Sequence, residues 1–226
     1  MTLFAAVTNT GNVFCWLLIY LQVNSQWKDH IQAEVNSFLE MTASYPDAAC
    51  LTDIPLDVLE LHTQSIEHCT NETLRMLFKG TLMRRNIGTD IFVSNTRIKH
   101  GAFLMYPTSD LHYEPLLYPN PALFNPLRFS PEEVEARRKH GITFLGWGAS
   151  RHVCVGKRVA LLMIRMTMVL MMSKYHITIV DSEGRPLNTV PDSLNDRLFK
   201  VCQPNQTVWL KYHRTGSSSE THIAAC

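Results

Sequence analysis

The chain has 226 residues, of which 46% are apolar and 18% are charged. This composition can fill a sizeable core, so the chain is neither disordered throughout nor a coiled coil. Its 21 basic and 20 acidic residues leave a net charge of +1, and we therefore expect no nucleic-acid partner.

The first 23 residues are mostly apolar but carry a polar interruption over residues 8–12. The first lysine is Lys28, so the basic region that opens a signal peptide is missing. Only residues 13–21 form a stretch without a polar residue, whereas a membrane span needs about 20 apolar residues. A buried helix with a polar notch fits better than a span over residues 3–21, which stays an alternative. Apolar residues at helical spacing from Trp27 to Leu39 predict a second helix.

The middle of the chain alternates between helical and strand-like patterns. A break is expected at residues 45–47, and residues 55–80 read as one or two helices. Short apolar runs over residues 81–105 predict strands. Six prolines over residues 106–131 predict an ordered meander without regular elements, followed by a short exposed helix over residues 132–140.

The last third begins with a glycine-rich segment that contains a cysteine. Residues 157–172 follow it and are apolar nearly all round, which predicts a central buried helix. Residues 176–180 and 208–212 read as strands. We expect residues 1–214 to form the folded part and the polar residues 215–226 to be a disordered tail.

The six cysteines are far apart and include no C-x-x-C pair, which argues against a disulfide scaffold or a structural zinc site. Cys154 differs from the others, because glycines flank it, Arg151 and His152 precede it, and a predicted helix follows. A helix N-terminus stabilises a thiolate, and glycines let the backbone approach a flat ligand closely. These features favour a ligand-binding cysteine over an inert buried one.

This segment resembles the cysteine signature of the cytochrome P450 family, in which a thiolate binds haem iron. It reads Trp147-Gly148-Ala149-Ser150-Arg151-His152-Val153-Cys154-Val155-Gly156. The resemblance implies that Cys154 is the axial ligand to the iron of haem b. It also implies that the other haem-binding residues are Trp147, Gly148, Arg151, His152 and Gly156, with His152 the best candidate for a propionate contact. Ser150 stands where the family usually has glycine, a change that a negative φ would tolerate.

A second motif is Glu72-Thr73-Leu74-Arg75, which alone would be an ordinary i,i+3 ion pair on a helix. It resembles the family's E-x-x-R motif, and Pro126-Leu127-Arg128-Phe129 resembles the later segment whose arginine completes that pair. The resemblance implies a structural role for Glu72, Arg75 and Arg128, which would hold the meander and the cysteine loop in place.

The polar notch itself is a third motif. Its Asn9-Thr10 pair resembles the family's distal-helix motif of an acidic residue and a threonine. Thr10 matches the threonine that helps to deliver protons to bound oxygen, and Asn9 replaces the acid, so both are candidate catalytic residues. The alternative is a hydroxyl that is merely satisfied inside a buried helix.

Together the motifs imply a mainly α fold with small β-sheets, corresponding to the C-terminal half of a cytochrome P450 of fungal secondary metabolism. The resemblance implies a monooxygenase that inserts one oxygen atom from O2 into a small organic substrate, with electrons from NADPH–cytochrome P450 reductase. It also implies possible membrane association, at the endoplasmic reticulum for full-length members. The alternative is a non-catalytic remnant or a haem-binding fragment.

Overall fold

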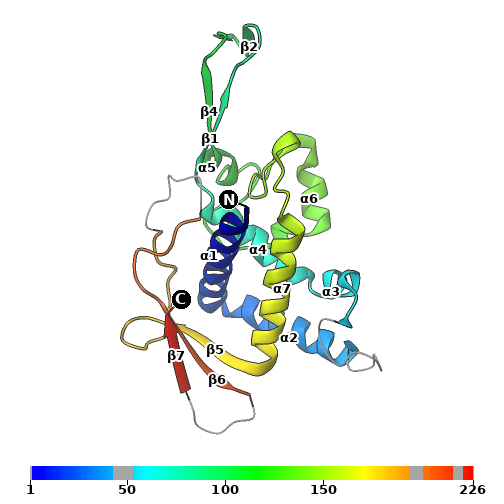
Figure 1. Cartoon of the computed structure of the whole chain (residues 1–226), viewed down its shortest axis with the longest axis vertical. Coiled ribbons are helices and arrows are strands. Elements are labelled where there is room, and N and C mark those ends of the chain that lie inside the picture. The colour runs from blue at the N-terminus through cyan, green and yellow to red at the C-terminus, as the bar shows by residue number, and fades with distance from the viewer. Residues whose placement is uncertain (1, 43–52, 194–200, 216–220, 226) are drawn as a thin grey trace.

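The computed structural model describes residues 2–42, 53–193, 201–215 and 221–225 (Figure 1). Its α-helices are α1 (Thr2–Val23), α2 (Ser25–Thr42), α3 (Leu56–His62), α4 (Gln64–Leu77), α5 (Thr108–His112), α6 (Pro131–Arg137) and α7 (Lys157–Lys174). Its strands are β1 (Thr81–Arg85), β2 (Ile91–Val93), β3 (Thr96–Ile98), β4 (Phe103–Pro107), β5 (Tyr175–Val180), β6 (Trp209–Arg214) and β7 (Thr221–Ala225). The predicted class, mainly α with small β-sheets, is confirmed. The predicted break at residues 45–47 lies outside the described residues.

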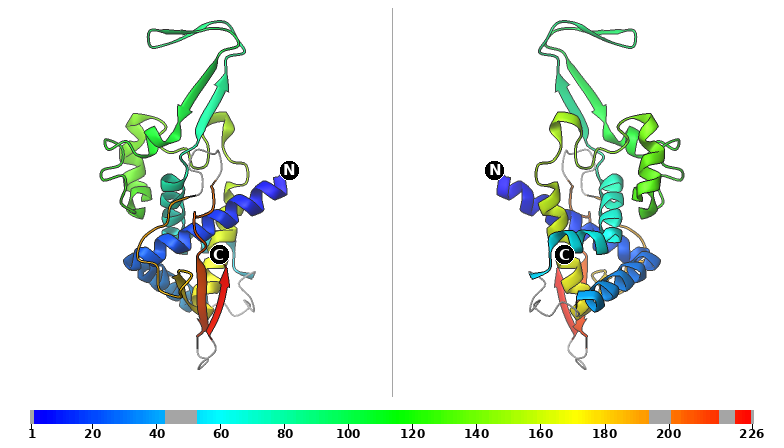
Figure 2. Two further views of the ribbon diagram at one scale, coloured as in Figure 1. Left: turned by 90° about the vertical axis from the view of Figure 1, so that its left-hand side faces the viewer. Right: turned by 90° about the vertical axis from the view of Figure 1, so that its right-hand side faces the viewer.

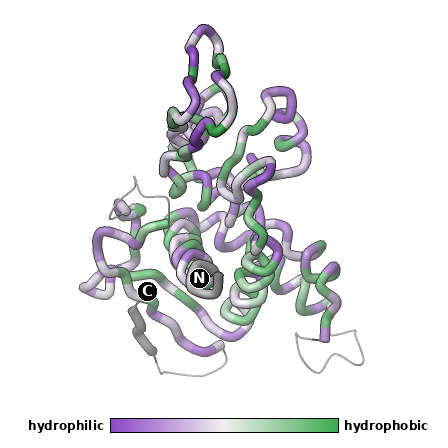
Figure 3. Tube along the Cα trace, turned by 45° about the horizontal axis from the view of Figure 1, so that its top comes forward, coloured by the Kyte–Doolittle hydropathy of each residue, from purple (hydrophilic) through white to green (hydrophobic). Residues whose placement is uncertain are grey.

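Helix α1 runs through the middle of the helical body and contacts α2, α4 and α7 (Figure 2). Its core segment starts at Val13, and Leu17 and Ile19 are fully buried. The tube coloured by hydropathy shows the apolar stretches of α1 and α7 in this body (Figure 3). Among the described residues, no helix combines the length and hydropathy that crossing a membrane requires.

The polar groups of α1 bond to a distant part of the chain. Asn12 donates from Nδ2 to the Val201 carbonyl at 2.9 Å, and Trp16 donates from Nε1 to the Cys202 carbonyl at 2.6 Å. The helix therefore continues through its polar notch, and half-buried Asn12 and buried Trp16 find acceptors at residues 201 and 202.

Helix α7 is less buried than its composition predicts. Leu161, Ile164 and Met168 face the core, whereas Val159 and Met163 are exposed. The expectation of burial all round was wrong because the elements that pack most extensively on α7, namely α1, α2, α4 and β5, leave part of its surface uncovered.

Strands β1 and β4 form an antiparallel pair that carries the β2–β3 hairpin away from the helices (Figures 1 and 2). Buried Asn86 holds the hairpin base, since its Nδ2 lies 2.9 Å from the Thr89 carbonyl and 3.1 Å from the Ile98 carbonyl. The meander that follows contains α5 and a 3₁₀ helix over Pro126–Phe129. The prediction of no regular elements there was therefore too strict, because proline is well accepted at the first position of a helix.

The C-terminal sheet has the order β5-β6-β7, with both pairs antiparallel. Strand β7 differs from the disordered tail expected over residues 215–226. Residues 221–225 pair with β6, whose backbone donors and acceptors would otherwise form an open edge. Residues 216–220 and 226 lie outside the described part.

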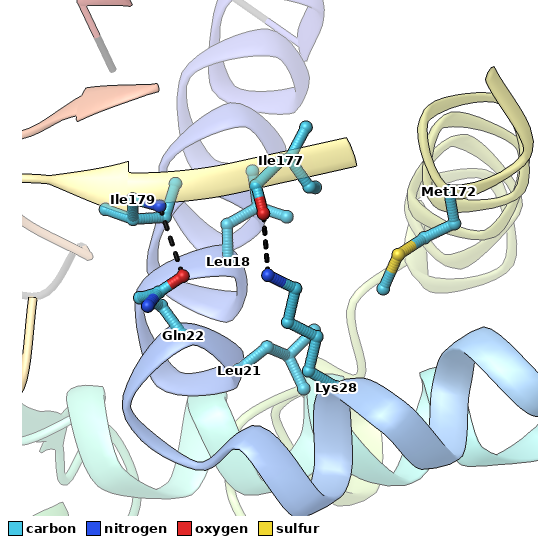
Figure 4. A pocket seen from close by; sticks show the side chains of 7 residues that line it. All are labelled: Leu18, Leu21, Gln22, Lys28, Met172, Ile177 and Ile179. Carbon is cyan, nitrogen blue, oxygen red and sulfur yellow. Dashed lines mark hydrogen bonds between the residues drawn. The ribbon is translucent and has the colours of Figure 1, made fainter. Parts of the chain in front are cut away.

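Strand β5 is fixed to the helices by two side chains that surround a small cavity (Figure 4). Lys28 donates from Nζ to the Ile177 carbonyl at 2.6 Å, and the Ile179 amide donates to Gln22 Oε1 at 3.2 Å. Burial lowers the pKa of Lys28, with Asp29 acting in the opposite direction. This corner locks the C-terminal sheet against α1 and α2.

Candidate functional site

A buried cluster of one carboxylate and two guanidinium groups joins helix α4 to the 3₁₀ helix over Pro126–Phe129. Arg75 donates to Glu72 in a bidentate manner, from Nε to Oε2 at 2.7 Å and from Nη2 to Oε1 at 2.9 Å. Arg128 donates from Nε to Glu72 Oε1 at 3.3 Å, although the two residues are 56 positions apart. Glu72 and Arg75 are fully buried. The structure thus brings these three predicted residues together.

The cluster is well hydrogen-bonded, which a buried charge requires. Arg75 also donates to the carbonyls of His112 and Pro121, at 2.5 and 2.7 Å. The Asn125 amide donates to Glu72 Oε1 at 3.0 Å. Burial lowers the pKa of Arg128, and the nearby Glu72 carboxylate acts in the opposite direction. The cluster therefore joins α4 to four residues of the meander, namely His112, Pro121, Asn125 and Arg128.

The cysteine loop, residues 144–156, connects the meander to α7. The Gly148 amide donates to the Leu145 carbonyl at 2.9 Å, and the Cys154 amide donates to the Trp147 carbonyl at 2.7 Å. The Lys157 amide then donates to the Cys154 carbonyl at 3.3 Å as α7 begins. These bonds fold the loop back on itself and leave Cys154 directly before the helix N-terminus.

Two positions of the loop have positive φ. Gly148 has a φ of 73°, and a Cβ placed there would lie 2.1 Å from the His152 carbonyl oxygen. Only glycine fits at such a position. Ser150 has a φ of 54°, so the negative φ that would tolerate serine is not present. A non-glycine residue in this left-handed region costs about 1–2 kcal/mol.

Cys154 is exposed and forms no disulfide. It borders an open pocket of about 640 Å³ between α4 and the start of α7. Asn71, Lys157 and Arg165 also line this pocket. Within the described ranges, no group of three or more His, Cys, Asp or Glu side chains could hold a metal ion.

The other predicted cofactor residues surround Cys154 in different ways. Arg151 and His152 form an exposed 3₁₀ turn with Ser150. Trp147 is half-buried and lies below Lys157, whose Nζ is 6.0 Å from the indole centroid. A Cβ at Gly156 would meet no atom within 4 Å, so the backbone there is open to a ligand.

The candidate catalytic pair lies on α1, where Asn9 is exposed and Thr10 is half-buried. In the described part of the chain, no hydrogen bond or ion pair connects either side chain to the cysteine loop. The two candidates thus lie on α1, whereas the cysteine loop lies directly before α7.

Three residues that the motifs did not single out hold the site together. Asn71 accepts a hydrogen bond from Trp147, Asn125 supports Glu72 as described above, and His112 contacts the loop at Leu145. His112 is a lone histidine in a proline-rich segment, and Asn71 and Asn125 are ordinary polar residues in the sequence. Their partners lie 33 or more residues away, so no local pattern reveals them.

Comparison with known proteins agrees with this geometry. The family model "Cytochrome P450" matches residues 1–203. The chain is 33% identical over 189 residues to "Cytochrome P450 monooxygenase dmxR5" of Cryptosporiopsis sp., which covers 81% of this chain and 36% of that protein. It is 30% identical over 191 residues to "Cytochrome P450 monooxygenase AacuE" of Aspergillus aculeatus, covering 82% and 38% of the two chains.

The comparison with solved structures shows the fold. The crystal structure of the "cytochrome P450DA heme domain" matches with a TM-score of 0.71 at 17% identity. The match covers 91% of this chain and 41% of that one. The chain thus spans less than half the length of the relatives that it matches. On the family model, the curated relatives and the fold, this chain belongs to the cytochrome P450 family.

Proposed function

We propose that this chain is the haem-thiolate part of a cytochrome P450 monooxygenase, with Cys154 as the axial ligand to haem b. The observation that carries the proposal is the setting of Cys154. Cys154 is exposed, its amide is bonded to the Trp147 carbonyl, and the Trp147 indole donates to Asn71, which directly precedes Glu72 of the buried cluster. The lone thiolate donor fits haem iron, which takes a single cysteine as its protein ligand in this family.

The residues around Cys154 suit the rest of the haem. Gly156 leaves the backbone open where a flat macrocycle would approach, and Gly148 allows the tight loop that carries Cys154. Arg151 and His152 are exposed, and their cationic or donor groups can hold propionate carboxylates, with His152 the preferred candidate. When bound, a haem-thiolate supplies the O2-activating chemistry, because the thiolate pushes electron density toward O–O cleavage.

We assign Glu72, Arg75 and Arg128 a structural role in this function. All three side chains are buried and hydrogen-bonded to one another or to backbone groups, which favours a structural role over contact with a substrate. Their contribution is to fix the meander and the loop so that Cys154 keeps its position.

We assign proton delivery to Thr10, whose Oγ1 can donate to and accept from water. Asn9 supports this role less well than an acidic residue, since an amide can orient water but does not ionise. Replacing Thr10 by alanine is expected to leave haem binding unchanged and to raise hydrogen peroxide release per electron consumed in the full-length protein. Unchanged coupling of electrons to product would leave Thr10 as a buried hydroxyl only.

The substrate class, electron donor and location are proposed for the full-length protein. The fungal relatives named above are monooxygenases by name, which supports an organic substrate of fungal secondary metabolism. We assign NADPH–cytochrome P450 reductase as the electron donor and the endoplasmic reticulum membrane as the location, by the same resemblance. The alternative is a non-catalytic remnant or a haem-binding fragment.

The test is a carbon monoxide difference spectrum of the purified chain after addition of haemin and reduction. We expect the thiolate band characteristic of the family in the unmodified chain and in Cys202→Ser, and its loss in Cys154→Ser. Loss of the band in Cys202→Ser but not in Cys154→Ser would contradict the ligand assignment. The absence of any thiolate band from the unmodified chain would favour the remnant.

A further inference from the structure

We propose that His112 is a positioning residue that sets the start of the cysteine loop through its imidazole ring. This inference rests on the proposed function, in which the cysteine loop supplies the thiolate ligand to haem. His112 lies at the end of α5 in the meander, and its side chain is fully buried.

Both ring nitrogens of His112 have backbone partners in different segments. The Leu145 amide donates to Nε2 at 3.1 Å, and Nδ1 lies 3.1 Å from the Phe78 carbonyl oxygen. An amide can only donate and a carbonyl can only accept. The ring must therefore be neutral, with its proton on Nδ1 and Nε2 free to accept. The ring thus connects the end of α4 to the beginning of the cysteine loop.

The backbone of His112 adds a third connection. Its carbonyl accepts from Arg75 Nη1 at 2.5 Å, so the residue is held directly by the buried cluster on α4. The imidazole also lies 5.5 Å from the Phe144 ring, centroid to centroid. His112 is therefore a bridge whose backbone is fixed by Arg75 and whose ring fixes Leu145.

The bond at Leu145 leads through the loop to Cys154. The Leu145 carbonyl accepts from the Gly148 amide, and the Trp147 carbonyl accepts from the Cys154 amide. Loss of the His112–Leu145 bond would leave the buried Leu145 amide without a partner, and the strained turn after it would lose its fixed end. The effect is expected to reach Cys154, although His112 does not touch it.

Two amide variants separate this bond from the packing of the ring. In His112→Asn, the short amide can still donate to the Phe78 carbonyl but cannot reach Leu145. In His112→Gln, the longer amide can offer its oxygen to the Leu145 amide. We expect amide hydrogen exchange of residues 144–156 to rise about tenfold in His112→Asn and to stay near the unmodified rate in His112→Gln. His176→Asn, which changes an exposed histidine on β5, serves as the matched control.

Two readouts keep this test distinct from that of the proposed function. Exchange over β5 and β6 in the same samples reports general unfolding, which would affect all segments alike. The carbon monoxide difference spectrum of the haemin-loaded protein reports thiolate ligation. We expect the thiolate band to be weaker in His112→Asn and close to that of the unmodified chain in His112→Gln. If exchange rises in His112→Asn but not in His112→Gln, and no variant shows a thiolate band, the positioning role is supported and the haem proposal fails.

Equal rises in exchange in the two variants, or no rise in His112→Asn, would overturn the proposal, because the ring would then act only as core packing. A third measurement needs no variant. Nitrogen NMR of the His112 ring in the unmodified chain should show the proton on Nδ1. A proton on Nε2 would overturn the proposal as well, since the Leu145 amide would then have no acceptor.

Discussion

The Trp147 indole donates from Nε1 to Asn71 Oδ1 at 2.7 Å, and these two residues are 76 positions apart. Asn71 directly precedes Glu72 on α4, so one helical turn holds both the cysteine loop and the buried cluster. The site is therefore built on α4 as a common support, and changes at this helix should affect the loop and the meander together.

Replacing Trp147 by phenylalanine tests this support. The ring is retained in part, but the buried Asn71 oxygen loses its donor, which should cost about 1–3 kcal/mol in the free energy of unfolding. Urea unfolding followed by circular dichroism measures it. Trp27→Phe is the control, because Trp27 is also half-buried but no side-chain hydrogen bond of its indole is seen in the described residues. Equal losses in the two variants would show that ring size, not the hydrogen bond, matters.

Removing the central carboxylate should have the largest effect on stability. Glu72→Ala leaves two buried guanidinium groups without their partner, which costs about 3–5 kcal/mol. We expect loss of soluble, haem-loaded protein. Glu60→Ala, which breaks an exposed pair with Arg158, should cost less than about 1 kcal/mol. Normal folding and haem content of Glu72→Ala with altered turnover would instead point to a catalytic role.

Gly148 and Ser150 both have a positive φ, but substitutions at the two positions should change the stability of the chain in opposite directions. Ser150→Gly should stabilise the chain by up to about 1 kcal/mol, because glycine adopts the φ of 54° without strain. Gly148→Ala should disrupt the loop, since its Cβ would meet the His152 carbonyl.

Gly141→Ala provides the comparison for Gly148→Ala. Gly141 also has a positive φ, of 80°, but a Cβ there meets no atom within 4 Å. Thermal melting of the three glycine-related variants should therefore rank Ser150→Gly highest and Gly148→Ala lowest. A Gly148→Ala melting temperature equal to that of Gly141→Ala would mean that the loop adapts to the extra atom.

The stability of the chain should fall in mild acid because of His112. Burial lowers the pKa of His112 to about 4, the Phe78 hydrogen bond raises it, and the charge of Arg75 lowers it. A histidine with a lowered pKa in the folded state binds its proton more readily when unfolded, so folding is favoured at high pH. This contribution is complete above about pH 6.5 and is lost as the pH falls toward 4.

Chemical unfolding between pH 7 and pH 4 measures this loss for the unmodified chain and for His112→Gln. The pH dependence should be clearly flatter in His112→Gln, because the amide does not titrate in this range. The same slope in both proteins would assign the acid sensitivity to other groups. Glu34 is one group that acts in the opposite direction, since burial raises its pKa although the Ser65 amide bonds to it.

Arg128 lies 56 positions from Glu72 and is indicated only by the family resemblance. The sequence is sufficient to predict most elements and the Glu72–Arg75 pair, because both depend on short-range patterns. The spacing of Glu72 and Arg75 within one helix is an example. It is not sufficient to predict the backbone of Ser150, whose φ follows from closure of the loop around Gly148. It also does not reveal His112, whose partners Phe78 and Leu145 are close only in the fold. The exposed side of α7 was missed because composition alone cannot say which elements lie beside a helix.

The bonds between α1 and the residues near 201 also set when the protein can fold. Trp16 and Cys202 are separated by 186 positions, and Asn12 and Val201 by 189. During synthesis, α1 leaves the ribosome long before residues 201 and 202 are made. Until then, the Trp16 indole and the Asn12 side-chain amide can form hydrogen bonds only with water. Closing so long a loop makes the central helix one of the slower parts of the core to settle. A nascent chain that stops before residue 201 would hold its most apolar helix without these two acceptors, which makes it a target for chaperones.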